Sequence, residues 1–169
     1  MPVARDLSPL RDNQGFGVGL NICTLNGREM PASVFSGAEE VQITSHEPKQ
    51  LRELVTGLLP MARHVLLRRS KLAGQPLHLH YIDTEKSLSA NSDALRDFID
   101  SIQNTRAVWM PISGNASLIL HTLRQVLPLY GAKQLALLNL LYVGESTLQP
   151  LLQLLATDSG MDFSFHALY

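Results

Sequence analysis

The fold class is decided by residues 107–143, AVWMPISGNASLILHTLRQVLPLYGAKQLALLNLLYV. Residues 107–112 are an apolar run of strand length, and Ser-Gly-Asn at 113–115 is typical of a helix start. A helix is predicted from there to Leu129, and residues 135–143 form a second apolar run, as expected for a strand covered on both faces. This order predicts parallel strands joined by a helix.

The same alternation extends in both directions. Further strands are predicted at 77–82 and 162–168, and further helices at 48–72, 91–103 and 144–156. Pro60 is expected to kink or split the first of these helices, and Asn91 or Ser92 is expected to cap the second. We therefore predict an α/β domain with a mostly parallel sheet flanked by helices.

The N-terminal part predicts a different arrangement. Strands are predicted at 16–25, 28–35 and 41–45, and Asn26-Gly27 between the first two is a strong hairpin signal. These three strands predict an antiparallel β-meander and complete the order βββαβαβαβαβ. Residues 1–14 are polar and predict a flexible tail, so that residues 15–169 form a single domain.

This order of elements resembles the core of ribonuclease H-like domains, including the actin-like ATPase branch. The resemblance covers roughly residues 16–130, and Val18-Gly19-Leu20-Asn21-Ile22 looks like the first strand of those families. They carry an aspartate where this chain has Asn21, which is a poor substitute for a metal-binding carboxylate. The resemblance therefore implies a fold more than a nuclease or ATPase activity.

Composition narrows the function classes. The chain has 14 basic and 15 acidic residues and a net charge of -1, so a nucleic-acid partner is not expected. Its single cysteine, Cys23, fits a reducing compartment, and the first 13 residues lack the apolar region of a signal peptide. We expect a cytoplasmic protein without a membrane segment. Leucine occupies 31 of the 169 positions, which favours a protein partner or a homo-oligomer.

Candidate ligand-binding residues follow three predicted strands. In a parallel sheet, ligands bind outside the carboxyl ends of the strands. The polar residues at these ends are Asp83, Ser113, Gly114, Asn115, Glu145 and Ser146. Residues 113–115 and 145–146 lead into predicted helices, whose free N–H groups attract anions. The same residue types are also common at the start of any helix.

A weaker candidate is a metal site. His78 and His80 lie two residues apart on a predicted strand and therefore face the same way. Asp83 or His166 is a candidate third ligand. The alternative is that both histidines are polar residues on the less buried face of the strand. No cofactor is specified by any motif.

Three other features have structural explanations beside functional ones. A basic cluster lies at the end of a predicted helix, where cations stabilise the helix; the alternative is a surface for nucleic acid or an acidic partner. Its residues are Arg63, His64, Arg68, Arg69 and Lys71. Cys23 is expected to be a buried thiol. Asn139 interrupts an apolar strand and needs hydrogen-bond partners if it is buried.

Two function classes remain open. The first is a non-enzymatic interaction or regulatory module, of the adaptor, inhibitor or immunity type, with a leucine-rich contact surface. The alternative is a small-anion or nucleotide-binding domain, or an enzyme, with its site at the carboxyl ends of the parallel strands. The sequence contains no complete catalytic constellation, which favours the first class.

Overall fold

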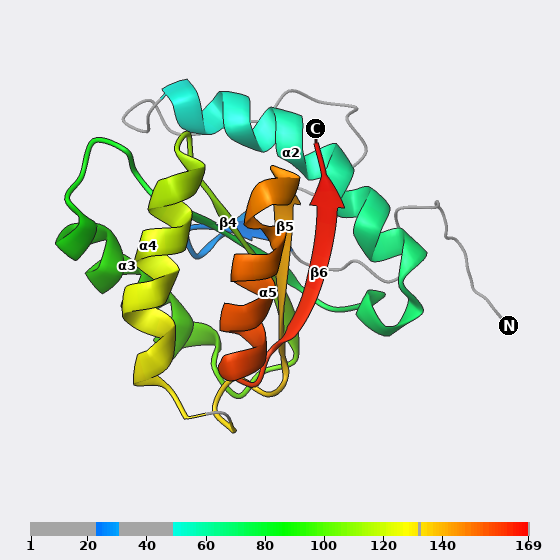
Figure 1. Cartoon of the computed structure of the whole chain (residues 1–169). Coiled ribbons are helices and arrows are strands. Elements are labelled where there is room, and N and C mark those ends of the chain that lie inside the picture. The colour runs from blue at the N-terminus through cyan, green and yellow to red at the C-terminus, as the bar shows by residue number, and fades with distance from the viewer. Residues whose placement is uncertain (1–22, 31–48, 132, 169) are drawn as a thin grey trace, which may run out of the picture.

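The computed structural model describes residues 23–30, 49–131 and 133–168. These residues form a sheet with helices on both faces (Figure 1). The strands are β1 (Cys23–Leu25), β2 (Arg28–Met30), β3 (Leu77–Tyr81), β4 (Ala107–Ile112), β5 (Leu138–Gly144) and β6 (Asp162–Ala167). The helices are α2 (Lys49–Arg68), α3 (Leu88–Ile102), α4 (Ala116–Val126) and α5 (Gln149–Asp158).

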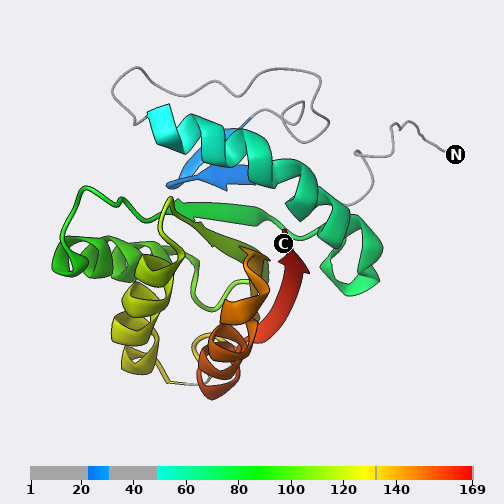
Figure 2. The same ribbon diagram turned by 45° about the horizontal axis from the view of Figure 1, so that its top comes forward.

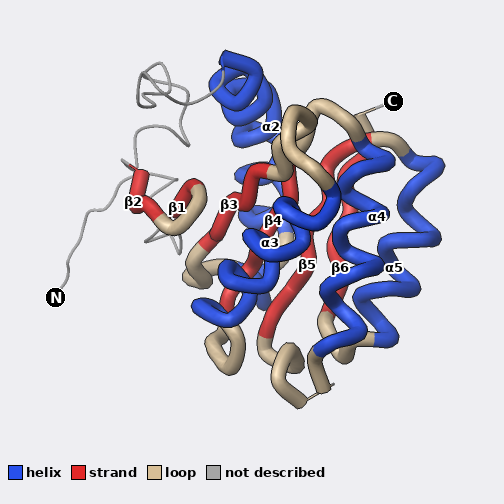
Figure 3. Tube along the Cα trace, turned by 90° about the vertical axis from the view of Figure 1, so that its left-hand side faces the viewer, coloured by secondary structure: helices blue, strands red, loops and turns tan. Residues whose placement is uncertain are grey.

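The strands lie in the order β2-β1-β3-β4-β5-β6 (Figure 3). From β1 through β3, β4 and β5 to β6, each strand is parallel to its neighbour. The predicted α/β class and mostly parallel sheet are therefore confirmed. Every residue of β4 and β5 is buried, as expected for central parallel strands covered on both faces.

The predicted antiparallel meander is not supported. β1 pairs in parallel with β3, and the only antiparallel contact described is the three-residue pairing of β1 with β2. The reason is that the hairpin signal at Asn26-Gly27 acts locally and specifies one pair of strands. The second edge of β1 is taken by a strand that returns after a helix. The predicted third strand, residues 41–45, lies outside the described residues, as do residues 1–14.

Two helix predictions need correction. The α2 helix continues through Pro60, whose side chain is exposed, so of the two predicted effects of this proline, a kink or a split, the split is wrong. The α3 helix begins at Leu88, and its cap is Ser87 instead of Asn91 or Ser92. The hydroxyl of Ser87 accepts the N–H of Ala90 at 3.0 Å, which satisfies a free donor of the first turn one turn earlier than predicted.

The sheet separates two apolar cores. α2 covers one face, and α3, α4 and α5 cover the other (Figure 2). Because successive strands from β3 to β6 are neighbours, the three helices between them lie on the same side, as connections of one handedness require. No helix in the described part of the chain combines the length and apolar character of a membrane span.

The α2 helix crosses one face of the sheet and borders the cavities described below. Leu51, in its first turns, packs in the same core as β1 and β3, whereas its later part contacts β5 and β6. The helix thus crosses the sheet from one side to the other. Three cavities border it along this path.

Candidate functional site

The largest of these cavities lies at the carboxyl ends of β1 and β3. It has a volume of about 660 Å³, which is within the ~300–1,000 Å³ typical of small-molecule sites. Its walls come from the β1–β2 turn, the start of α2, the β3–α3 loop and one side of α3. We call it the His80 cavity; its lining residues are Asn26, Gly27, Leu51, His80, Tyr81, Asp83, Lys86, Asn91, Ala94, Asp97, Phe98 and Ser101.

The β1–β2 turn forms one wall and is tied to β3. Asn26 and Gly27 have φ values of 51° and 85°, the left-handed pair that the Asn-Gly signal predicted. The Asn26 N–H donates to the carbonyl of Leu79 at 2.9 Å, and its side-chain oxygen accepts the N–H of Tyr81 at 3.0 Å. The turn is therefore fixed against the end of the strand that carries His80.

The β3–α3 loop forms a second wall and is held by Asn91. This side chain is 3% exposed, and its oxygen accepts the N–H of Asp83 at 3.0 Å. Its amide group donates to the carbonyls of Asp83 at 2.9 Å and of Lys86 at 3.4 Å. The Asp83 carboxylate in turn accepts the N–H of Glu85 at 2.9 Å. The loop therefore presents Asp83 and Lys86 from a cross-linked backbone.

His80 is the buried polar group of this cavity. Its side chain is 6% exposed, and neither ring nitrogen has a hydrogen-bond partner among the described residues. The ring stacks on Phe98 of α3, with centroids 4.7 Å apart and an interplanar angle of 28°. Burial lowers the pKa of His80 to about 4. At neutral pH the ring is therefore uncharged and holds one unused donor and one unused acceptor.

This arrangement is better suited to binding than to proton transfer. A general base works best with a pKa near the operating pH, and the pKa of His80 lies well below it. Asp83, Lys86 and Asp97 give the lining a formal charge of one negative unit, which does not favour anions. Phe98 supplies an aromatic surface beside the imidazole.

The metal site that the sequence suggested is incomplete here. His78 and His80 face α3 together, as the two-residue spacing predicted, and His80 is buried, so the less buried face assigned to both is wrong for this residue. The Nδ1 atom of His78 lies 2.8 Å from the Thr24 hydroxyl. His166 lies on β6, an edge strand that β4 and β5 separate from β3. The described residues contain no group of three His, Cys, Asp or Glu side chains suited to a metal.

A second cavity lies at the carboxyl ends of β4 and β5. It has a volume of about 250 Å³, and we call it the Tyr142 cavity. Ser113, Gly114 and Glu145 line it together with apolar side chains of α2, α4 and β5. The Glu145 carboxylate adds negative charge at the place where an anion was expected.

The start of α4 also has less capacity for an anion than its sequence suggested. The Asn115 side-chain oxygen accepts the N–H groups of Ser117 at 2.9 Å and Leu118 at 3.3 Å. The Ser113 hydroxyl accepts the N–H of Asn115 at 3.2 Å. The helix is thus capped by its own side chains. Asn115 and exposed Ser146 line neither of the two cavities.

The candidate residues therefore divide between two places. Asp83 belongs to the His80 cavity, whereas Ser113, Gly114 and Glu145 belong to the Tyr142 cavity. Sequence reasoning missed Phe98 and Asn26 as parts of a site. The Asn-Gly signal pointed to Asn26, but nothing local indicated that its turn closes a cavity. Phe98 carried only the signal of a core residue.

Cys23 is a structural thiol, as expected. It is 2% exposed, and burial raises the pKa of its thiol to about 12. A thiol with such a pKa is a poor nucleophile at neutral pH.

Comparison with known proteins does not assign this site to a family. Protein-family models, curated proteins and solved structures were compared with the chain, and none matches it. The ribonuclease H-like architecture stays a prediction, and Asn21 lies outside the described residues.

Proposed function

We propose that this domain binds a small organic molecule in the His80 cavity. The observation that carries the proposal is a buried imidazole, with no hydrogen-bond partner among the described residues, that borders a cavity of about 660 Å³. Buried polar groups in folded proteins are nearly always hydrogen-bonded, and leaving one without a partner costs about 1–3 kcal/mol. A bound ligand would supply the missing partner.

The lining suggests the chemistry of the ligand. A flat ring would continue the stack of His80 on Phe98, and a hydroxyl or amine group would bond to the free imidazole nitrogens. The carboxylates of Asp83 and Asp97 favour a neutral or cationic molecule over an anion. This proposal keeps the site at the carboxyl ends of parallel strands and replaces the anion with a ligand of another charge.

The test is a ligand screen with a matched pair of variants. A library of neutral and cationic ring compounds is screened by thermal shift and ligand-observed NMR against the wild type, His80→Leu and His121→Gln. His121 is exposed on α4, on the face of the sheet away from α2, and lines none of the three cavities. We expect hits that His121→Gln retains and that His80→Leu weakens by about fivefold to thirtyfold, since one lost hydrogen bond to a ligand is worth about 1–2 kcal/mol.

Two results would contradict this proposal. One is a screen in which no neutral or cationic compound binds the wild type. The other is a set of hits that bind His80→Leu as tightly as the wild type, because the imidazole would then contribute nothing to recognition.

An interaction module is the second proposal, and it is supported by two leucines of α5. Leu151 and Leu154 are 39% and 58% exposed and lie three residues apart, on one side of the helix. Their contact with a second copy would bury apolar surface. Solution mass measured over a range of concentrations tests this, with Leu151→Gln/Leu154→Gln as the variant. A wild type that stays monomeric at every concentration would exclude self-association through α5.

A further inference from the structure

The third cavity bordering α2 combines the end of that helix with β6. It has a volume of about 250 Å³ and is lined by His64, Val65, Arg68, Arg69, Phe165 and His166. The two histidine rings come from segments about a hundred residues apart, and their centroids are 5.8 Å from each other. We call this cavity the basic hollow. In the folded chain, His166 of β6 therefore lies beside the cationic end of α2.

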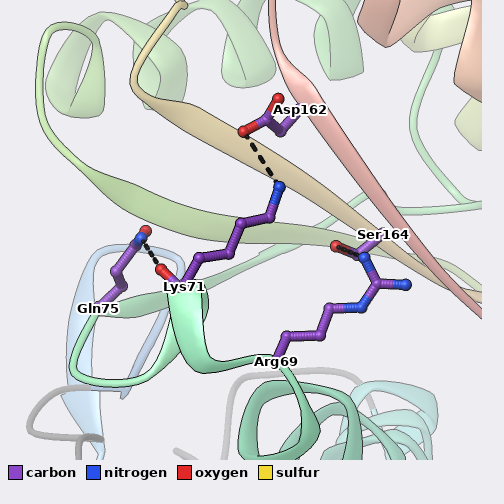
Figure 4. A network of polar contacts seen from close by, with 5 residues as sticks. All are labelled: Arg69, Lys71, Gln75, Asp162 and Ser164. Carbon is purple, nitrogen blue, oxygen red and sulfur yellow. Dashed lines mark hydrogen bonds and ion pairs between the residues drawn. The ribbon is translucent and has the colours of Figure 1, made fainter.

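The arginines of the basic hollow contact a histidine and a serine among the described residues. Arg68 Nη1 lies 3.3 Å from His64 Nε2, and Arg69 Nη1 donates to the Ser164 hydroxyl at 3.3 Å. The neighbouring carboxylate, Asp162, pairs with Lys71 at 3.7 Å (Figure 4). Figure 4 shows the Lys71 and Arg69 side chains reaching β6 side by side, each to a different residue. Neither guanidinium group faces a carboxylate within the described part of the chain.

A structural role explains part of this arrangement. Arg68 lies in the last turn of α2, where a cation interacts favourably with the helix dipole. β6 is an edge strand of the sheet, and cationic side chains near an edge discourage pairing with other chains. These effects do not account for His166, which comes from β6 and lines the same hollow as both arginines.

We propose that the basic hollow binds the phosphate dianion of a phosphomonoester. Two guanidinium groups match its charge and donate to its oxygens through paired N–H groups, and the imidazoles provide further N–H donors. The hollow is smaller than the ~300–1,000 Å³ that encloses a drug-sized ligand, so it accommodates the phosphate group while the rest of the ligand stays outside. This site is separate from the His80 cavity and does not depend on it.

The histidines make the binding directly measurable. The ring-proton NMR signals of His64, His166 and His121 are followed in the full chain during titration with inorganic phosphate, near neutral pH and at constant ionic strength. We expect saturable shifts for His64 and His166. His121 serves as the internal control, because it lies on α4, on the opposite face of the sheet, and its signal should not move.

Variants separate a built site from general charge attraction. Arg68→Gln/Arg69→Gln should weaken phosphate binding by about tenfold or more, because two charge-assisted contacts are lost. Arg96→Gln/Arg124→Gln removes two exposed arginines from α3 and α4 and should leave the affinity unchanged. Arg68→Gln alone keeps the bond between Arg69 and Ser164, so it reports on binding even if the double variant loosens β6.

The carrier of the phosphate is identified in the same assay. Glycerol phosphate and a phosphoserine peptide present the same dianion, and binding of either with loss in the double variant supports the proposal; the tighter of the two indicates the source. Three results would overturn it: no saturable shift with any of these ligands, an equal response of His121, or unchanged affinity in both Arg68→Gln/Arg69→Gln and Arg68→Gln. Tighter binding of a phosphodiester oligonucleotide than of phosphate would also overturn it.

Discussion

The His80 cavity and the basic hollow border opposite ends of α2 and use histidine in opposite ways. His80 is buried against Phe98, and burial lowers its pKa to about 4, so the ring is neutral in a large cavity. His64 is exposed and His166 is half-buried, and both stand beside arginines in a small hollow. Burial and neighbouring side chains differ between the two places, and this difference is the reason why we propose different ligands for them.

The largest expected effect is on the aromatic support of the His80 cavity. Phe98→Ala removes a ring that is 8% exposed and contacts both His80 and Trp109, so we expect a loss of about 3–5 kcal/mol in the free energy of unfolding. Phe165→Ala, in the half-buried wall of the basic hollow, should cost clearly less. Urea denaturation measures both. Equal losses would show that the two aromatic walls are equivalent.

The pH dependence of stability should report on His80. Its pKa is about 4 in the folded protein, against an ordinary value of 6.5 for a histidine in water, so the unfolded chain binds the additional proton between these values. Stability should therefore be complete above the higher value and fall as pH decreases toward the lower one, by about 3 kcal/mol for this group. Denaturation curves across this range measure the effect.

The control for this pH effect is His80→Leu. Most of the loss should disappear in the variant, and a remainder should come from His78, whose pKa burial also lowers. If wild type and variant lose stability in parallel, another group is responsible.

Replacing His80 should affect stability and binding in opposite directions. His80→Leu removes two buried nitrogens that have no partner among the described residues, so we expect the free energy of unfolding near neutral pH to rise by about 1–3 kcal/mol. Ligand binding in the cavity should weaken in the same variant, because one hydrogen bond to the ligand is lost. A drop in stability would indicate that the imidazole has a partner in the folded protein.

Asn139 is a matched case without a large cavity. It is 3% exposed on β5, neither polar atom of its side chain has a partner among the described residues, and it lines none of the three cavities. Asn139→Leu should raise the free energy of unfolding by about 1–2 kcal/mol and leave ligand binding at both sites intact. Thermal unfolding with and without ligand distinguishes this variant from His80→Leu.

The smallest effect is expected near the basic hollow. Lys71 and Asp162 form an ion pair at 3.7 Å, with side chains 63% and 67% exposed, where solvent screens the attraction. Lys71→Gln should lower the free energy of unfolding by less than about 1 kcal/mol. A larger loss in urea denaturation would show that Lys71 supports β6 beyond this pair.

Most elements of the fold could be predicted, because their signals are local. The apolar runs at β4 and β5, the helical spacing of α2 and the left-handed turn at Asn26-Gly27 all depend on neighbouring residues. Of the predicted meander, the structure describes only the antiparallel pair of β1 and β2, because the Asn-Gly signal specifies a single hairpin; the parallel pairing of β1 with β3 had no local signal. The cap of α3 failed because several serines and asparagines near its start were suitable.

The candidate site was only partly accessible to prediction. Asp83 was correctly expected to follow a parallel strand, at the edge of the sheet where the carboxyl ends of the strands lie. The burial of His80 depends on Phe98, and the basic hollow depends on His166 reaching the end of α2. Neither contact has a signal in its own stretch of sequence.

The sequence by itself determined the types of the elements, the common facing of His78 and His80 and the burial of Cys23, because backbone geometry and side-chain periodicity act over a few residues. Only the tertiary structure decided that one histidine is enclosed beside a cavity and that others join two arginines at a sheet edge. The physical reason is that burial, pKa and the shape of a cavity arise from contacts between residues far apart in the chain.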